Sequence, residues 1–247
     1  MAGARHGPAQ TLTALPSPRR RRVGLLGGSF NPAHGGHRRI SLFARQALGL
    51  DEIWWLVSPG NPLKDACTMA PLSARFASAR AQARRAPIRV TVIERDLGTR
   101  YTVDTLRAIR RRWPRLDFVW LMGTDNLAQF DRWKHWRDIA RSMPIAAIAR
   151  PGYDGAAVAS PAMAWLRRYR TSATSLHRPE RWSAPTLVLL QFDPDRRSAT
   201  ELRRDDPDWA SRWSNRFQRD GVTHRRVVPE HAEPVPFAPK RMSGKPR

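Results

Sequence analysis

Short apolar runs alternate with amphipathic segments along the central part of the chain. Six runs have the composition of buried strands, at residues 22–28, 52–58, 88–94, 117–123, 144–150 and 186–192. Helical periodicity falls between them, at about 36–48, 71–85, 102–112 and 134–142. Strands that alternate with helices in this way predict a parallel sheet with right-handed crossovers. We therefore expect an α/β fold with a doubly wound parallel sheet in a single domain.

The two ends of the chain lack this periodicity. Residues 1–21 combine Pro, Ala, Gly and Arg, and residues 220–247 are rich in Pro and basic residues. Such compositions bury too little apolar surface to fold alone. We expect a disordered basic tail at 1–21, a folded domain at 22–219 and a Pro-rich basic tail at 220–247. Residues 152–181, rich in Ala, Arg and Ser, are expected to form a helix-and-loop excursion of the same domain.

Cysteine content and apolar length limit the class of protein. The chain of 247 residues has one cysteine, Cys67, which excludes an internal disulfide framework and a zinc site made only of cysteines. No apolar run approaches the roughly 20 residues that span a bilayer. The first residues also lack the apolar stretch of a secretory signal. We expect a cytoplasmic protein that has no membrane partner.

The formal net charge is +23. A positive charge of this size favours phosphorylated partners and attracts nucleic acid as readily as nucleotides. A general preference for arginine explains it equally well. The sequence has no zinc-finger spacing, RNP-like aromatic motif or homeodomain-like helix, so it does not predict a specific nucleic-acid partner. A basic nucleic-acid-binding protein stays the alternative from another functional class.

The stretch GGSFNPAHGGH, residues 27–37, follows the first predicted strand. Gly27 and Gly28 have no Cβ and allow the backbone to approach a ligand closely. His34 and His37 lie one turn apart at the start of the next helix, where N–H groups and the helix dipole favour an anion. The pattern differs from both G-x-G-x-x-G and the P-loop. It predicts a polyphosphate site; the alternative is a pair of surface histidines at a helix end.

This stretch resembles the motif G-G-[ST]-F-[DN]-P-x-H-x-G-H of the bacterial nicotinate-nucleotide adenylyltransferase family, within the H-x-G-H nucleotidyltransferase superfamily. Supporting blocks follow in the family's order: NPLK (61–64), RYTVDTL (100–106), LMGTDNLAQFDRW (121–133), ARPGY (149–153) and RSATELR (197–203). Together they cover nearly all of residues 22–215. The resemblance implies a Rossmann-like nucleotidyltransferase fold, with 22–219 as the catalytic domain.

The resemblance also implies an activity in NAD biosynthesis. ATP and nicotinate mononucleotide would give deamido-NAD and pyrophosphate, so these two nucleotides are the expected partners. Such phosphoryl chemistry depends on positioning and charge stabilisation more than on proton transfer. Mg²⁺ is expected as a cofactor that the substrate phosphates mainly hold, so no protein metal-ligand set is expected.

Site residues carry over from the family position by position. The expected catalytic residues are His34, His37 and Arg203. The residues expected to bind ATP and its phosphates are Gly27, Gly28, Ser29, Phe30, Lys64, Gly123, Asp125, Asn126, Ser198 and Thr200. The residues expected to bind nicotinate mononucleotide are Tyr101, Thr102 and Trp133. Ala199 departs from the Ser or Thr common in the family, which removes one hydroxyl contact.

Several local alternatives stay open. Residues 197–203 are equally typical of a hydroxyl N-cap with a solvated arginine, and Lys64 of a solvated loop lysine. The turn at Gly123–Asn126 is equally typical of a helix cap. Within the superfamily, the alternatives are a nicotinamide-preferring or a phosphopantetheine adenylyltransferase. The sequence does not predict the oligomeric state.

Overall fold

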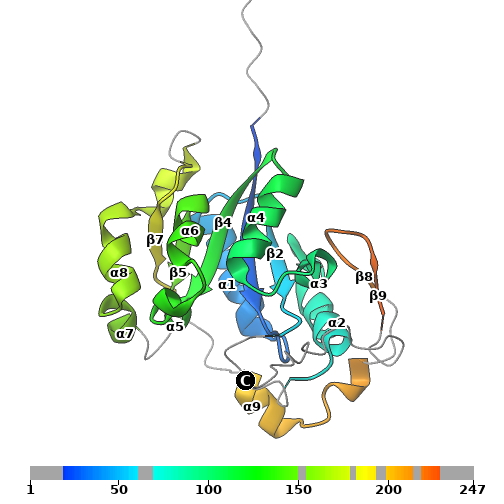
Figure 1. The fold of residues 1–247 in the computed structure, drawn as a ribbon. Coiled ribbons are helices and arrows are strands. Elements are labelled where there is room, and N and C mark those ends of the chain that lie inside the picture. Colours follow the sequence, from blue (N-terminus) through cyan, green and yellow to red (C-terminus); the bar gives the residue numbers. More distant parts are fainter. Residues whose placement is uncertain are drawn as a thin grey trace, which may run out of the picture.

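One parallel sheet organises the chain. The computed structural model describes residues 19–60, 69–149, 154–178, 182–192, 199–213 and 218–228. In these ranges, seven strands form a sheet in the order β3-β2-β1-β4-β5-β7-β6, with every neighbouring pair parallel. Figure 1 shows helices on both faces of this sheet. The predicted doubly wound α/β fold in a single domain is confirmed.

The elements have the following bounds. The strands of the sheet are β1 (Arg21–Gly28), β2 (Glu52–Val57), β3 (Ile88–Thr91), β4 (Leu116–Gly123), β5 (Ile145–Ile148), β6 (Arg170–Thr171) and β7 (Leu187–Leu190). The helices are α1 (Gly35–Ala47), α2 (Leu72–Ala83), α3 (Ile93–Leu97), α4 (Thr102–Arg112), α5 (Thr124–Leu127), α6 (Trp136–Ser142), α7 (Asp154–Val158), α8 (Pro161–Leu166) and α9 (Ala199–Asp205). Short 3₁₀ turns are η2 (Phe130–Arg132), η3 (Arg167–Tyr169), η4 (Ala173–His177) and η6 (Ser211–Trp213). The strands β8 (Gln218–Arg219) and β9 (Arg226–Val227) form a separate antiparallel pair.

A hydrophobic core lies on each face of the sheet. Trp54 joins the cluster that includes residues of α4 and α6, and Trp55 joins the cluster that includes residues of α1 and α2. Successive side chains of a strand point to opposite faces, which explains why these neighbours separate. Both indoles are almost fully buried. Burial on both faces accounts for the nearly continuous apolar runs in the sequence.

The third predicted strand, 88–94, is shorter in the structure. β3 ends at Thr91, and α3 begins at Ile93. The cause is a long-range contact: the Val92 N–H donates to Oδ2 of Asp220 at 2.8 Å, and Asp220 is 1% exposed. The carboxylate therefore takes a backbone donor just before the helix begins, in the manner of a helix cap.

The folded body continues beyond the predicted boundary at residue 219. The Gly221 N–H donates to the Val90 carbonyl at 2.8 Å, and a Cβ on Gly221 would lie 2.9 Å from that oxygen. Residues 218–228 thus pack against β3, at the edge of the sheet, and cover part of a strand edge that would otherwise be exposed. The rest of the predicted C-terminal tail, and residues 1–18 of the N-terminal tail, lie outside the described residues.

Candidate active site

The candidate site lies at the carboxyl ends of β1 and β4. Leu26 pairs with Leu121, so Gly28 and Gly123 occupy matching positions two residues further along adjacent strands. The order of strands reverses here, because β1 lies between β2 and β4. Open α/β sheets bind ligands at this switch point. The loops after both strands are the two that carry the predicted phosphate and adenosine residues.

His34 and His37 form a reciprocal cap at the start of α1. The Gly36 N–H donates to Nδ1 of His34 at 3.1 Å, and the His34 N–H donates to Nδ1 of His37 at 3.3 Å. With Nδ1 as the acceptor, each neutral imidazole carries its proton on Nε2. The two ring centroids lie 4.0 Å apart. The helix start therefore presents two adjacent imidazole N–H donors of fixed tautomer.

The side chain of Phe30 packs against the His37 ring. Its φ of 47° is in the left-handed region, which is strained for a bulky residue, and its side chain is 1% exposed. The phenyl ring lies 4.9 Å from the His37 ring and stacks on Trp55 at 5.0 Å. The phenyl ring therefore packs against both the His37 and Trp55 rings, and the role of Phe30 in binding ATP stays a prediction.

Arg75 of α2 is a buried cation that sequence reasoning did not identify. It is 1% exposed, and its guanidinium donates to the carbonyls of Ser29 at 2.9 Å and Ser58 at 2.7 Å. It also donates to the carbonyls of Ala70 at 2.8 Å and Pro59 at 3.3 Å. The same side chain therefore ties the loop after β1 to the loop after β2.

Glu94 of α3 lies beside this cation. Burial raises its pKa to about 7, against the opposing effects of a hydrogen bond with Ser58 and the charge of Arg75. A carboxyl group whose proton is lost near neutral pH is typical of functional sites. No sequence signal marked Glu94, because it lies in a segment that the apolar pattern assigned to a strand.

Gly27 and Gly28 make room for aromatic rings. A Cβ on Gly27 would lie 2.6 Å from the Trp120 ring, and one on Gly28 would lie 3.3 Å from the Phe30 ring. The predicted reason for these glycines is close approach of a ligand, and the structure adds a packing reason. A side chain at Gly27 would displace Trp120, which is 3% exposed in the core.

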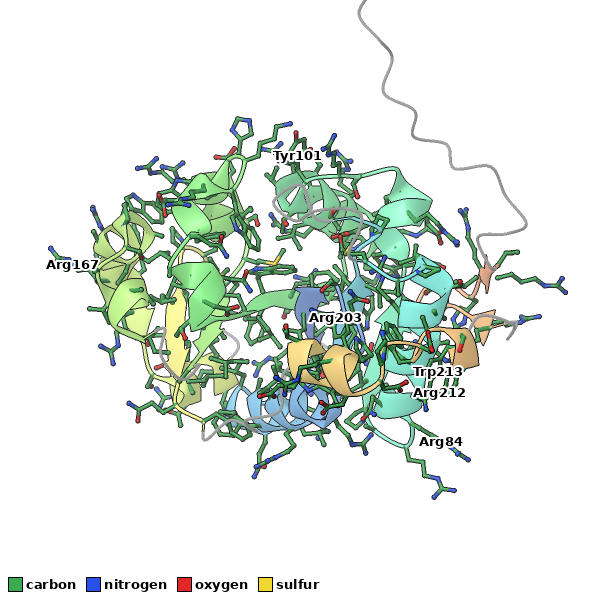
Figure 2. All side chains as sticks on the ribbon, turned by 90° about the horizontal axis from the view of Figure 1, so that it is seen from below. Arg84, Tyr101, Arg167, Arg203, Arg212 and Trp213 are labelled. Carbon is green, nitrogen blue, oxygen red and sulfur yellow. The ribbon has the colours of Figure 1, made fainter. Side chains whose placement is uncertain are left out.

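Arg203 of α9 reaches back to the first motif. Its Nη1 donates to the Asn31 carbonyl at 2.6 Å, and its Nη2 donates to Oγ1 of Thr200 at 3.2 Å. Figure 2 views the molecule from below, and Arg203 lies near the centre of that view. The structure thus brings residues 199–203 of the RSATELR block to the GGSFNP loop. Ser198 and Lys64 lie outside the described residues.

The two blocks predicted to hold the nicotinate ring also meet. Nζ of Lys134 lies 4.4 Å from the ring centroid of Tyr101, which is 37% exposed and precedes Thr102 at the start of α4. Trp133 packs edge-on against Phe130 at 5.4 Å. In Figure 2, Tyr101 lies across the end of the molecule from Arg203. The binding roles of Tyr101, Thr102 and Trp133 stay predictions.

The adenosine block forms the short helix α5 directly after β4. Gly123 is its N-cap with extended backbone, and the side chains of Asp125 and Asn126 are half-buried.

Among the described residues, no three or more His, Cys, Asp or Glu side chains form a group that could hold a metal ion. In the same residues, no helix is long and apolar enough to cross a membrane.

Comparisons with known proteins agree on one family. Residues 25–205 match the cytidylyltransferase-like family model. A protein of Erythrobacter litoralis named "Probable nicotinate-nucleotide adenylyltransferase" is 70% identical over 214 residues, covering 87% of this chain and 98% of that relative. One of Parvibaculum lavamentivorans with the same name is 50% identical over 182 residues, covering 74% and 90%.

Solved structures share the fold. The nicotinic acid mononucleotide adenylyltransferase of Plasmodium falciparum, complexed with NaAD, is 15% identical and has a TM-score of 0.54. The same protein complexed with APC has a TM-score of 0.52. Each match covers 74% of this chain and 83% of the solved chain. At this level of identity, the likeness concerns the fold alone.

Proposed function

The chain belongs to the nicotinate-nucleotide adenylyltransferase family of cytidylyltransferase-like proteins, and from this premise we propose how its own residues act on ATP and nicotinate mononucleotide. The products are deamido-NAD and pyrophosphate. The observation that carries the proposal is that two imidazole donors and Arg203 converge on the loop after β1. His34 and His37 start α1, and Arg203 reaches the Asn31 carbonyl at 2.6 Å.

The reaction exchanges one phosphorus–oxygen bond for another. A phosphate oxygen of the mononucleotide attacks the α-phosphorus of ATP in line, and the bond to the β-phosphate breaks, so that pyrophosphate leaves. No proton has to be removed from the nucleophile, because a phosphate monoester is already anionic near neutral pH. Catalysis then depends on positioning and on preorganised donors where negative charge develops.

The histidine pair suits this demand. Because each Nδ1 accepts a backbone N–H, each Nε2 carries a proton to donate toward phosphate oxygens. The N-terminus of α1, a helix of 13 residues, adds backbone donors and a favourable dipole. In the proposed complex, His34 and His37 bind the ATP phosphates, and His37 stabilises the charge at the reacting centre. Arg203 and Thr200 bind the phosphates from α9.

Mg²⁺ is proposed as the cofactor, held by the substrate phosphates and water. The donor set is compatible with this assignment, since each imidazole uses Nδ1 as an acceptor and carries a proton on Nε2, so neither ring offers a free lone pair to a metal ion. The Arg203 guanidinium of α9, which reaches the same loop, repels a cation. When bound, the ion would neutralise phosphate charge.

The nicotinate ring is proposed to lie between the start of α4 and Trp133. The contact of Lys134 with Tyr101 brings these two segments together. The N–H groups in the first turn of α4, around Thr102, are donors that suit the ring's carboxylate. An amide in that place would turn its own N–H₂ toward donors, and an unpaired buried polar group costs about 1–3 kcal/mol.

Comparison of the two mononucleotides tests this proposal. We expect kcat/KM to be about 5- to 150-fold higher with nicotinate than with nicotinamide mononucleotide, which is that free energy as a ratio. Pyrophosphate release is measured with each acceptor at the same ATP concentration. Equal values, or a preference for the amide, would contradict the placement of the carboxylate at α4 and leave adenylyl transfer itself intact.

A further inference from the structure

A cleft of about 710 Å³ lies at the amino ends of β4 and β5. Five arginines line it: Arg20, Arg107, Arg110, Arg111 and Arg141. They come from the residue before β1, from α4 and from α6. Its volume is within the range of sites that bind small molecules.

This cleft is separate from the candidate active site. Leu116, the first residue of β4, lines the cleft, and Gly123, the last residue of the same strand, ends at the active site. Eight residues of strand separate the two ends by roughly 23 Å, at about 3.3 Å per residue. The two sites therefore lie at opposite ends of the strands of the sheet.

The cleft has a surplus of positive charge. Asp117 is the one acidic residue among the described residues that line it, and it pairs with Arg20 at 3.2 Å. Arg107 pairs with Asp138 at 3.0 Å outside the lining. For Arg110 and Arg111, the described part of the chain provides no ion-pair or hydrogen-bond partner, and both side chains are exposed. Two successive arginines of α4 thus line the cleft without a counter-charge among the described residues.

The dipole of α4 explains only some of the arginines that line the cleft. The C-terminal turn of α4 carries three arginines, and each cation near a helix C-terminus is stabilised by its dipole. That effect does not explain Arg20, which reaches the same cleft from the residue before β1.

We propose that this cleft binds a ligand with several adjacent phosphates. Guanidinium groups bind phosphate oxygens in pairs of parallel hydrogen bonds, which a point charge cannot do. Arg110 and Arg111 supply two such groups, and Arg20 and Arg141 line the same cleft. A phosphate chain of this kind belongs either to a short polyphosphate or to a single-stranded nucleic acid.

The test compares two variants that remove the same charge. Arg110→Gln/Arg111→Gln changes the cleft, and Arg84→Gln/Arg85→Gln changes an exposed adjacent pair after α2, on the β3 side of the sheet. Figure 2 shows Arg84 pointing outward at the rim. The probes are a fluorescein-labelled single-stranded RNA of about 12 nucleotides and inorganic tripolyphosphate as its competitor. Thermal unfolding and kcat/KM for adenylyl transfer verify that both variants fold.

We expect the Arg110/Arg111 variant to bind RNA about tenfold more weakly at low salt. The slope of log Kd against log salt concentration should fall by about 1.4, the value for two lost phosphate contacts. The Arg84/Arg85 variant should stay within about twofold of the wild type. Displacement of RNA by tripolyphosphate assigns the site to short phosphate chains, and its failure assigns the site to a strand. An equal loss in both variants, or no loss in either, would overturn the proposal.

Discussion

Arg75 is predicted to stabilise the loops that follow β1 and β2, beside the active site. Its guanidinium makes four hydrogen bonds to carbonyls, three of them at 2.7–2.9 Å, and it is 1% exposed. Lysine keeps the charge but has no planar fork, and its ammonium can reach only some of these acceptors. The substitution Arg75→Lys therefore leaves buried carbonyls of the loops without donors.

The magnitude follows from those bonds. A hydrogen bond from a charged donor contributes about 1.5–3 kcal/mol, and bonds that share one side chain are not additive. If two of the four bonds are lost, we expect the free energy of unfolding to fall by about 2–3 kcal/mol. The loop that includes Ser29 is then less fixed, so KM for ATP should rise several-fold. Urea unfolding at constant m-value and steady-state kinetics measure the two effects.

Arg80→Lys on the same helix is the matched control. Arg80 is exposed and donates to the Arg219 carbonyl, so its substitution should change the free energy of unfolding by less than about 0.5 kcal/mol. A stability of Arg75→Lys within that same margin, with KM for ATP unchanged, would refute the view that Arg75 holds the loops.

Three further changes have defined outcomes. His37→Ala should lower turnover by about 100- to 1000-fold, because a transition-state donor is lost, while the lost cap costs about 1 kcal/mol in a urea titration; near-normal turnover would remove His37 from catalysis. Glu94→Gln should stabilise the protein on the order of 2 kcal/mol at pH 8. The reason is that the native pKa of Glu94, about 7, is raised above the usual 4.5, so wild-type stability falls as pH rises between these values and stays low above them. Glu201→Gln, which changes an exposed carboxylate on α9, is the control and should show no such gain. Equal pH profiles of stability for the wild type and Glu94→Gln would refute the burial argument. EDTA should abolish activity, and Mg²⁺ should restore it, with the urea midpoint unchanged throughout; a midpoint that falls with EDTA would indicate a metal bound by the protein itself.

Most of the fold could be predicted because its signal is local. Buried parallel strands are short apolar runs, and five of the six predicted runs coincide with strands to within two residues at either end. The run at 88–94 is the exception, because Asp220, far along the chain, binds the Val92 N–H and ends the strand early. The folded part extends past the predicted boundary at 219 for a related reason, since the hairpin whose Gly221 N–H donates to the Val90 carbonyl leaves no periodic pattern in the sequence.

The candidate site divides in the same way. His34 and His37 were identifiable because the eleven-residue motif is contiguous, whereas Arg75 and Glu94 act through tertiary contacts. In the sequence, Arg75 resembles the exposed Arg80 of the same helix; only the packing of α2 against two loops buries one and exposes the other. Burial also gives Glu94 its raised pKa, and no sequence pattern encodes that enclosure.

Product analysis tests the central claim most directly. The full chain is incubated with ATP, nicotinate mononucleotide and Mg²⁺, and the products are separated by chromatography and identified by mass. The account predicts that deamido-NAD and pyrophosphate form in equal amounts, only when both nucleotides are present, and that folded His37→Ala forms them at least about 100-fold more slowly. Absence of deamido-NAD with the folded wild type, or an equal rate with His37→Ala, would contradict adenylyl transfer at this site.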